Sequence, residues 1–176
     1  MTSVALVSVR GPDRVGLVAT IADYLFNAGV NLGDTTFAAL GTRSEFVALC
    51  ELPEGLTPDA IEAGLQRLAE LDGAEVRAVP YSFDPRPGPA GGVTHRITIS
   101  GGDQLGLVAR LAEVFKQYGA NIVRLEARKL PETEGGIYAT RFAVFIPTEK
   151  ASLCLATVGN TAGSLGLNCR VDQDLL

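Results

Sequence analysis

A loop whose residues suit ligand binding occurs twice in this chain of 176 residues. The first copy, Gly11-Pro-Asp-Arg-Val-Gly-Leu-Val-Ala19, returns ninety positions later as Gly101-Gly-Asp-Gln-Leu-Gly-Leu-Val-Ala109. The match extends without a gap through Asp34 and Arg124 and includes nine identities in 24 aligned pairs. Average residue usage predicts roughly one or two identities by chance. Because ninety residues is the size of a small domain, the repeat predicts a duplicated domain.

The repeated loop lies between a predicted strand and a predicted helix, so it contains the unpaired backbone N–H groups of a helix N-terminus. These donors and the helix dipole together favour an anion. Gly16 and Gly106 fall in the predicted first turn, where the missing Cβ lets a ligand approach the backbone. Asp13 and Asp103 offer a carboxylate to an ammonium group at the same rim.

An asparagine begins the strand after the helix in both copies, Asn31 in the first and Asn121 in the second. The predicted topology makes this strand an edge strand, and an asparagine there can donate and accept hydrogen bonds. Donors for a carboxylate beside acceptors for an ammonium group describe a site for a zwitterion, such as a free amino acid. A structural interpretation stays open, because aspartate often caps helices, glycine serves close packing and asparagine is common in turns.

The sequence contains few residues that could form a catalytic site. His95 is the only histidine, and its predicted place on the apolar face of a strand favours a structural role. Cys50 lies in an apolar strand, where cysteine usually acts as a small hydrophobic residue. Glu132 and Glu134 lie in a hairpin with no apolar surroundings to raise a pKa. An acylphosphatase is a further alternative, but the loop has few donors for a phosphate. The sequence predicts no catalytic residue.

The composition narrows the class of protein. The net charge is −5, and no basic stripe typical of nucleic-acid binding is evident. We interpret Arg124, Arg128 and Lys129 as the solvated face of a strand and its hairpin end. No run approaches the roughly 18 apolar residues of a membrane-spanning helix, and no signal peptide is evident. The three cysteines are too scattered for a disulfide framework or a zinc site, so we expect no metal, no cofactor and a cytoplasmic location.

Strand and helix signals alternate through the first repeat. Asp13 occupies the predicted N-cap of the first helix, which Gly29 ends. Thr57 and Pro58 open the second helix, which Gly73 ends. The predicted apolar stripe of the first helix is Val15, Val18, Ala19, Ala22, Leu25 and Phe26. The predicted strands are 3–10, about 32–40, 45–52 and about 74–80.

The second repeat follows the same order. Its predicted strands are 93–100, 121–130, 137–146 and about 167–172, and its helices are 104–118 and a segment after Thr148 that glycines interrupt. Its hairpin, 131–136, is longer, and aligning Phe46 with Phe142 implies six inserted residues.

Residues 81–92 contain three prolines and three glycines and are predicted to be a linker between domains 1–80 and 93–176. Each domain has the order βαββαβ. With right-handed crossovers this order gives an α+β, ferredoxin-like fold, an antiparallel four-stranded sheet with both helices on one face. Apolar runs such as Phe46–Cys50 predict that a partner, most simply a second copy of the chain, buries part of the open face.

The motif Asp-Arg-Val-Gly-Leu-Val, followed by a helix and Gly-Val-Asn-Leu, resembles the ACT domain, and so does the second copy. Two tandem ACT-like units without a further domain resemble the glycine cleavage system transcriptional repressor family. This resemblance implies a non-enzymatic regulator, a homodimer that binds a small amino acid, such as glycine or serine, at ACT interfaces. It implies action through a partner transcription factor, without direct nucleic-acid or membrane binding. ACT units that only dimerise or dock a partner remain the alternative.

The resemblance also implies the ligand-binding residues. In both copies they lie in the loop and at the start of the second strand, and Gln104 replaces Arg14 in the second copy. If an arginine holds the ligand carboxylate, the second site is weaker or recognises another molecule. The first site comprises Pro12, Asp13, Arg14, Val15, Gly16, Leu17 and Asn31, and the second comprises Gly102, Asp103, Gln104, Leu105, Gly106, Leu107, Asn121 and Ile122.

Overall fold

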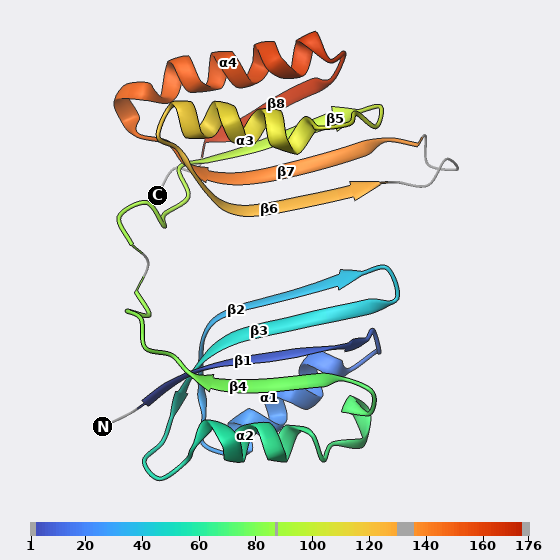
Figure 1. The fold of residues 1–176 in the computed structure, drawn as a ribbon, viewed down its shortest axis with the longest axis vertical. Coiled ribbons are helices and arrows are strands. Elements are labelled where there is room, and N and C mark those ends of the chain that lie inside the picture. The colour runs from blue at the N-terminus through green and yellow to red at the C-terminus, as the bar shows by residue number, and fades with distance from the viewer. Residues whose placement is uncertain (1–2, 87, 130–135, 174–176) are drawn as a thin grey trace. The chain divides into compact units, whose positions relative to one another are not determined.

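Two units with the same order of elements make up the chain (Figure 1). The structure is a computed structural model that describes residues 3–86, 88–129 and 136–173. Its two compact units are Met1–Pro85 and Arg86–Leu176, and the division between them falls within the segment 81–92.

The first unit contains four strands, two α-helices and one short 3-10 helix. Its elements are β1 (Ser3–Pro12), α1 (Leu17–Asn27), β2 (Asn31–Leu40), β3 (Arg43–Leu52), α2 (Pro58–Leu65), η1 (Ala69–Leu71) and β4 (Glu75–Pro80). The second unit repeats the order of strands and α-helices, but its 3-10 helix precedes the second α-helix. Its described elements are β5 (His95–Gly101), α3 (Leu107–Gln117), β6 (Asn121–Lys129), β7 (Tyr138–Phe145), η3 (Thr148–Lys150), α4 (Ala151–Ser164) and β8 (Asn168–Gln173).

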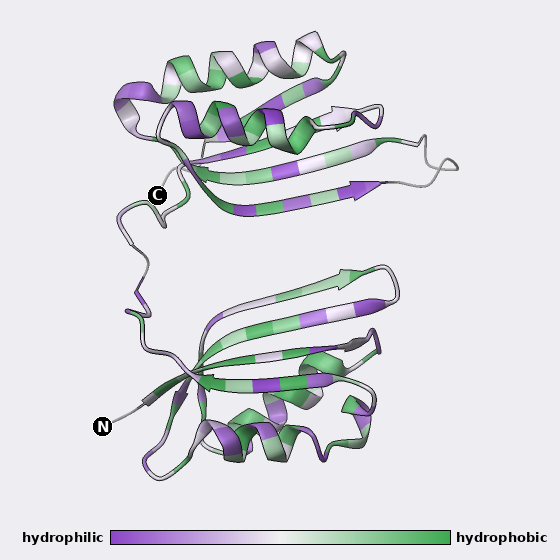
Figure 2. Ribbon diagram, in the orientation of Figure 1, coloured by the Kyte–Doolittle hydropathy of each residue, from purple (hydrophilic) through white to green (hydrophobic). Residues whose placement is uncertain are grey.

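Each unit is an antiparallel sheet with both helices on one face, so the predicted α+β, ferredoxin-like fold is confirmed. The strand orders are β2-β3-β1-β4 and β6-β7-β5-β8, which makes β2 and β6 edge strands as predicted. Residues alternate between the buried helix side and the opposite open face along the central strands. The central strands β1 and β3 are green over most of their length in Figure 2, because residues on both faces are apolar.

The first helix begins later than predicted, and the N-cap prediction is wrong. Gly16, not Asp13, is the N-cap residue of α1, and no side chain caps this helix. The Asp13 N–H instead donates to the Thr42 carbonyl, at 2.9 Å. Gly106 is the N-cap residue of α3 in the same way. Asp13 and Asp103 therefore lie outside the helices.

The predicted apolar stripe of α1 is also wrong, apart from Leu25. The helix buries Leu17, Ile21 and Leu25, which are one turn apart. Phe26, from the predicted stripe, is 76% exposed. The α1 sequence therefore has a second apolar row on its solvent side.

The backbone conformation at the N-caps of α1 and α3 requires glycine. Gly16 has φ 89° and Gly106 has φ 79°, in the left-handed region that L side chains avoid. No atom lies within 4 Å of a Cβ built on either glycine, so the strain of a substitution comes from the backbone alone.

Gly16→Ala is therefore expected to lower the free energy of unfolding by about 1–2 kcal/mol. The matched control is Gly159→Ala in the interior of α4, where an added Cβ also meets nothing within 4 Å and φ is negative. This control should raise stability by about 0.5–1 kcal/mol. Urea unfolding followed by circular dichroism measures both changes. Equal effects of the two substitutions would contradict the backbone argument.

The second helices differ between the units. Thr57 caps α2, its side chain accepting a hydrogen bond from the Ala60 N–H at 3.2 Å, and Pro58 follows as predicted. However, α2 ends at Leu65, eight residues before the predicted stop at Gly73, and η1 follows. The helix expected after Thr148 does form, as η3 and α4, in spite of its glycines.

The hairpin of the second unit is shorter than the sequence alignment implied. Val9 pairs with Phe46 in the first sheet, and its repeat, Ile99, pairs with Thr140 in the second. The structural equivalent of Phe46 is therefore Thr140 rather than Phe142, and the insertion is four residues (140 − 46 = 94, against a repeat of 90). Residues 130–135, which include most of the predicted hairpin, lie outside the described residues.

Candidate functional site

The repeated loops have one geometry in both units. The Thr20 N–H donates to the Gly16 carbonyl, and the Arg110 N–H donates to the Gly106 carbonyl. The N–H groups of the first helical turn before these residues have no acceptor within the helix. One donor in each loop is already used, because the Leu17 N–H donates to the Arg14 carbonyl and the Leu107 N–H donates to the Gln104 carbonyl, both at 3.3 Å. The remaining donors lie at a helix N-terminus, where the sequence placed them. Leu17, however, points into the core at 4% exposure, and its repeat Leu107 is buried too.

Arg14 contacts the backbone of its own unit. Its Nη1 donates to the Glu70 carbonyl at 2.9 Å, and its Nη2 donates to the Asp72 carbonyl at 3.0 Å. These carbonyls belong to η1 and the residue after it, so Arg14 ties the loop to the end of the 3-10 helix. A guanidinium has five N–H donors, and three remain for a ligand. Gln104 makes no hydrogen bond with a described residue through its side chain, so the second loop lacks this tie.

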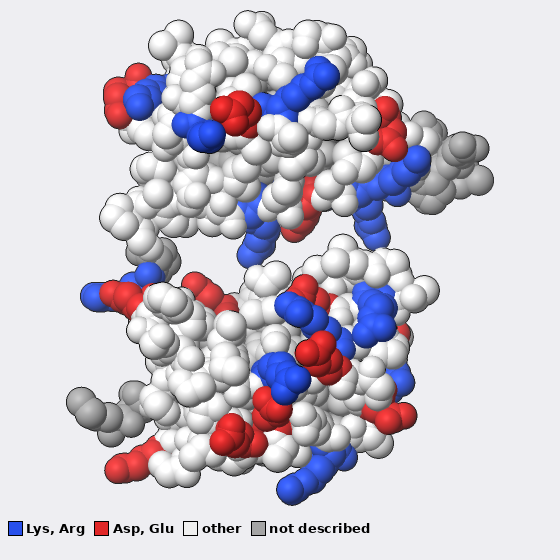
Figure 3. Space-filling model, viewed as in Figure 1, with Lys and Arg blue, Asp and Glu red and all other residues white. Residues whose placement is uncertain are grey.

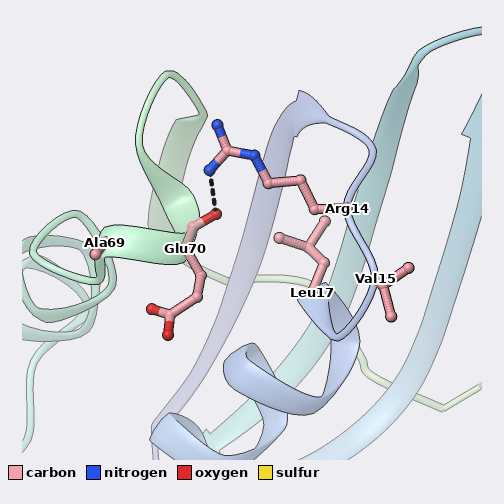
Figure 4. A pocket seen from close by; sticks show the side chains of 5 residues that line it. All are labelled: Arg14, Val15, Leu17, Ala69 and Glu70. Carbon is pink, nitrogen blue, oxygen red and sulfur yellow. Dashed lines mark hydrogen bonds between the residues drawn. The ribbon is translucent and has the colours of Figure 1, made fainter.

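A depression of about 330 Å³ lies beside the hydrogen bond between Arg14 and the Glu70 carbonyl (Figure 4). This volume is at the lower end of the range for ligand pockets. Figure 4 shows the Arg14 side chain passing over it to reach the Glu70 carbonyl. The depression is lined by Arg14, Val15, Leu17, Ala69 and Glu70.

The two candidate aspartates differ in their contacts. Asp103 accepts from Lys129 Nζ at 3.3 Å, an ion pair that joins the second loop to the end of β6. The Asp13 carboxylate has no hydrogen bond or ion pair with a described residue. Lys129, which we interpreted as solvated, therefore has a specific partner. The carboxylate of the first loop is the more available of the two.

The two candidate asparagines also have different partners. Asn31 Nδ2 donates to Glu51 Oε2 on the neighbouring strand, at 2.9 Å. Asn121 Nδ2 donates to the backbone carbonyl of Ala90, in the linker segment, at 2.8 Å. The sequence offered no signal for either partner. A ligand at Asn121 would have to replace a bond to the chain's own backbone.

Neither unit brings its asparagine and its loop together. Asn31 pairs with Glu51, beside the N-terminal end of β1, whereas the loop follows Pro12 at the other end of β1. At about 3.3 Å per residue, the length of β1 separates them by about 30 Å. Asn121 lies beside the start of β5 in the same way, and the second loop follows its end.

Several of the remaining predicted residues have clear positions. Val15 and Leu105 are fully exposed at the loop tips, at 108% and 98%. Pro12 is the last residue of β1, and an added Cβ on Gly102 would meet no atom within 4 Å. Ile122 is half-buried, opposite Val144, and directly precedes an irregularity in β6. Both loops therefore present a large apolar side chain to solvent at the same position.

Of the residues considered for catalysis, His95 and Cys50 are buried, and Glu132 and Glu134 lie outside the described residues. His95 is 7% exposed, and its Nδ1 lies 2.9 Å from Thr94 Oγ1. Cys50 is fully buried in β3. Burial raises the pKa of the Cys50 thiol to about 11, and it also raises the pKa values of Cys154 and Cys169. Because the nucleophile is the thiolate, these cysteines are poor nucleophiles at neutral pH.

A thiol-reaction experiment tests this burial. At pH 8 we expect Cys50 in the folded protein to react at least about a hundredfold more slowly than in urea, because little thiolate forms and the side chain is enclosed. Cys169, which is half-buried, should react first. Raising the pH from about 9 to about 11 should weaken folding, since the unfolded thiol ionises in that range and the folded Cys50 does not. Cys50 labelling at equal rates in both states would contradict the prediction.

Among the residues that the structure describes, no helix has both the length and the apolar character needed to cross a membrane.

The comparisons with known proteins agree with the fold. Residues 3–79 match the sequence model of the ACT domain. No curated protein matches the chain. An unknown protein from Galdieria sulphuraria has a TM-score of 0.77 and 24% identity, covering 99% of this chain and 100% of that one.

A second structure, named "putative glycine cleavage system transcriptional repressor", has a TM-score of 0.67 and 16% identity over 99% of both chains. At these identities the two likenesses concern the fold, and they extend over both units. Residues 3–79 of the first unit are thus similar in sequence to the ACT domain, and the chain as a whole has the fold of two tandem ACT-like units.

Proposed function

We propose that this protein is a non-enzymatic regulator that binds a small amino acid between ACT units and acts through a partner protein. Glycine and serine are the first ligands to test. The regulated process is the transcription of amino-acid metabolism genes, in line with the name of the repressor that has the same fold.

The main support for this proposal is the distance between the repeated loop and the asparagine in the same unit. Backbone donors and Asp13 lie at one end of the sheet, and Asn31 lies at the other, about 30 Å away. A zwitterion that needs both groups therefore requires the loop of one unit and the strand start of another. The exposed Val15 at the loop tip supports the same arrangement, because an apolar side chain that is fully exposed in one unit gains stability when another unit covers it.

The first loop is the better ligand site of the two. Its Arg14 is held in place by two hydrogen bonds and keeps three donors for a carboxylate. Its Asp13 has no described partner to displace. In the second unit, Asp103 and Asn121 are both engaged, with Lys129 and with the Ala90 carbonyl.

A thermal-shift screen of the full chain against the twenty amino acids tests the proposal. A ligand that binds only the folded state raises its stability, so one amino acid or a small related set should raise the melting temperature. Gly16→Leu should remove that shift, because it strains the loop that supplies the donors. A well-folded protein that none of the twenty stabilises would contradict the proposal.

That negative result would favour the second candidate function, a docking module without a ligand. The observation behind this alternative is the exposure of Val15 and Leu105, since apolar loop tips suit a protein contact as well as a ligand-bearing interface.

A further inference from the structure

The open face of the second sheet carries five arginines. Register places Glu126 of β6 directly opposite Arg141 of β7, with Arg124 and Arg128 two residues to either side of Glu126. Arg96 of β5 lies between Ala143 of β7 and Asp172 of β8. Arg170 of β8 lies opposite Thr98 on the same face. All five side chains are exposed, whereas the central residues between them are small and partly or fully buried: Ala139, Ala143, Thr98 and Ser100.

The arginines outnumber the acidic residues on this face, five against two. Within the described part of the chain, Arg124, Arg128 and Arg141 make no ion pair, whereas Arg170 pairs with Asp172 at 3.2 Å. Glu126 and Asp172 are the two acidic residues at register positions on this face. Figure 3 shows blue, red and blue side chains in turn along the edge of the second unit where Figure 1 labels β6.

The two units contribute unequally to the net charge of −5. The first unit has five Lys and Arg against twelve Asp and Glu, and the second has ten against eight. Their net charges are therefore −7 and +2. An excess of positive charge on one sheet of an acidic protein marks a surface for an acidic partner.

The first unit provides a contrast at equivalent positions. Leu6 stands where the second unit has Arg96, and Val47 stands where it has Arg141. Arg10 on this face is already paired with Glu45, at 2.7 Å. The first unit keeps an arginine, Arg77, where the second has Arg170, and Arg77 lies 3.7 Å from Glu75. The open face of the first sheet therefore has apolar residues at two of the arginine positions and paired charges elsewhere, whereas that of the second is richer in arginine.

We propose that the open face of the second sheet, defined by Arg96, Arg124, Arg128, Arg141 and Arg170, docks an acidic segment of a protein partner. This inference rests on the proposed function, because it identifies where the partner protein would bind. Arg124 and Arg128 are about 13 Å apart along β6, and acidic residues at alternate positions of an extended segment match that spacing.

Three observations favour a protein over a nucleic acid. All five cations are arginines, which protein interfaces enrich, whereas they deplete lysine. Glu126 and Asp172 interrupt the positive charge, and this mixture suits a protein surface better than a uniform phosphate chain. The protein as a whole is acidic, with a net charge of −5, and a long polyanion is repelled by such a chain.

The test uses the full chain and a fluorescein-labelled peptide of about twenty residues with glutamate at alternate positions, separated by serine. Fluorescence anisotropy at about 50 mM NaCl should detect binding, and about 500 mM NaCl should abolish it, because the charges are exposed and screened. Arg124→Glu with Arg128→Glu should weaken binding at least about tenfold. The matched control, Arg43→Glu with Arg67→Glu, makes the same charge change on the first unit and should change binding less than about twofold.

Each other outcome overturns the proposal. Equal weakening by both double variants would mean a general charge effect, and absence of peptide binding would exclude the acidic-segment surface. Binding of a twenty-nucleotide thymidine strand in preference to the peptide would identify a nucleic-acid surface. Loss of a dimer in the Arg124/Arg128 variant would make this face a contact between copies. The amino-acid thermal shift, measured on the same variants, reports separately on the proposed function and on folding.

Discussion

Replacing Phe46 by alanine is expected to lower the free energy of unfolding by about 3–5 kcal/mol. Phe46 is 1% exposed in the middle of β3, and it is among the largest fully buried side chains of the first unit. It lies between Val9 of β1 and Phe37 of β2 on the helix side of the sheet. Truncation removes apolar contacts and leaves a cavity that strands on both sides prevent from closing.

Phe26→Ala is the matched control for this prediction. It is the same substitution in the same unit, but the Phe26 ring is 76% exposed on α1, so the loss should stay below about 1 kcal/mol. Urea denaturation followed by circular dichroism gives both values. Similar losses for the two variants would mean that the solvent side of α1 is covered in solution.

The same pair of residues shows why the fold could be predicted while the packing of α1 could not. The repeat, the glycines and prolines at the ends of the elements and the order βαββαβ were sufficient to predict the fold, because the topology follows from the order of the elements. The orientation of α1 depends on which of two apolar rows faces the sheet, Leu17-Ile21-Leu25 or Val18-Ala22-Phe26. Both rows have helical spacing, and few polar residues mark the solvent side, so periodicity cannot choose between them.

The candidate site was predicted in part. The repeated motif identified loops that lie at helix N-termini, where some backbone N–H groups have no acceptor within the helix. The end of the sheet at which Asn31 lies also follows from topology, since a helix returns the chain to the start of β1. The sequence analysis did not use this relation when it grouped Asn31 with the loop. The contacts of Arg14 could not be predicted. They depend on α2 ending at Leu65, directly after Gly64, rather than at the predicted stop Gly73, so that η1 presents its carbonyls to the loop.

Asp13→Ala is expected to abolish stabilisation by the amino acid that the screen identifies, whereas Asp103→Ala should leave most of it. At a ligand concentration of about 100 times Kd, binding stabilises the folded state by about 2.7 kcal/mol, which raises the melting temperature by roughly 5–10 °C. The difference between the variants follows from the contacts of the two carboxylates. Asp13 has no partner among the described residues, and Asp103 is paired with Lys129 at 3.3 Å.

Lys129→Ala separates this explanation from a simple difference in charge. The exposed Lys129–Asp103 pair contributes little to stability, so its loss should change the unfolding free energy by less than about 1 kcal/mol. If the pair keeps the second loop from binding, Lys129→Ala should raise the number of ligands bound per chain in isothermal titration calorimetry. An unchanged number would leave Gln104 or the Asn121–Ala90 bond as the cause of the asymmetry. A thermal shift that disappears in Asp103→Ala and persists in Asp13→Ala would instead make the second loop the sensor.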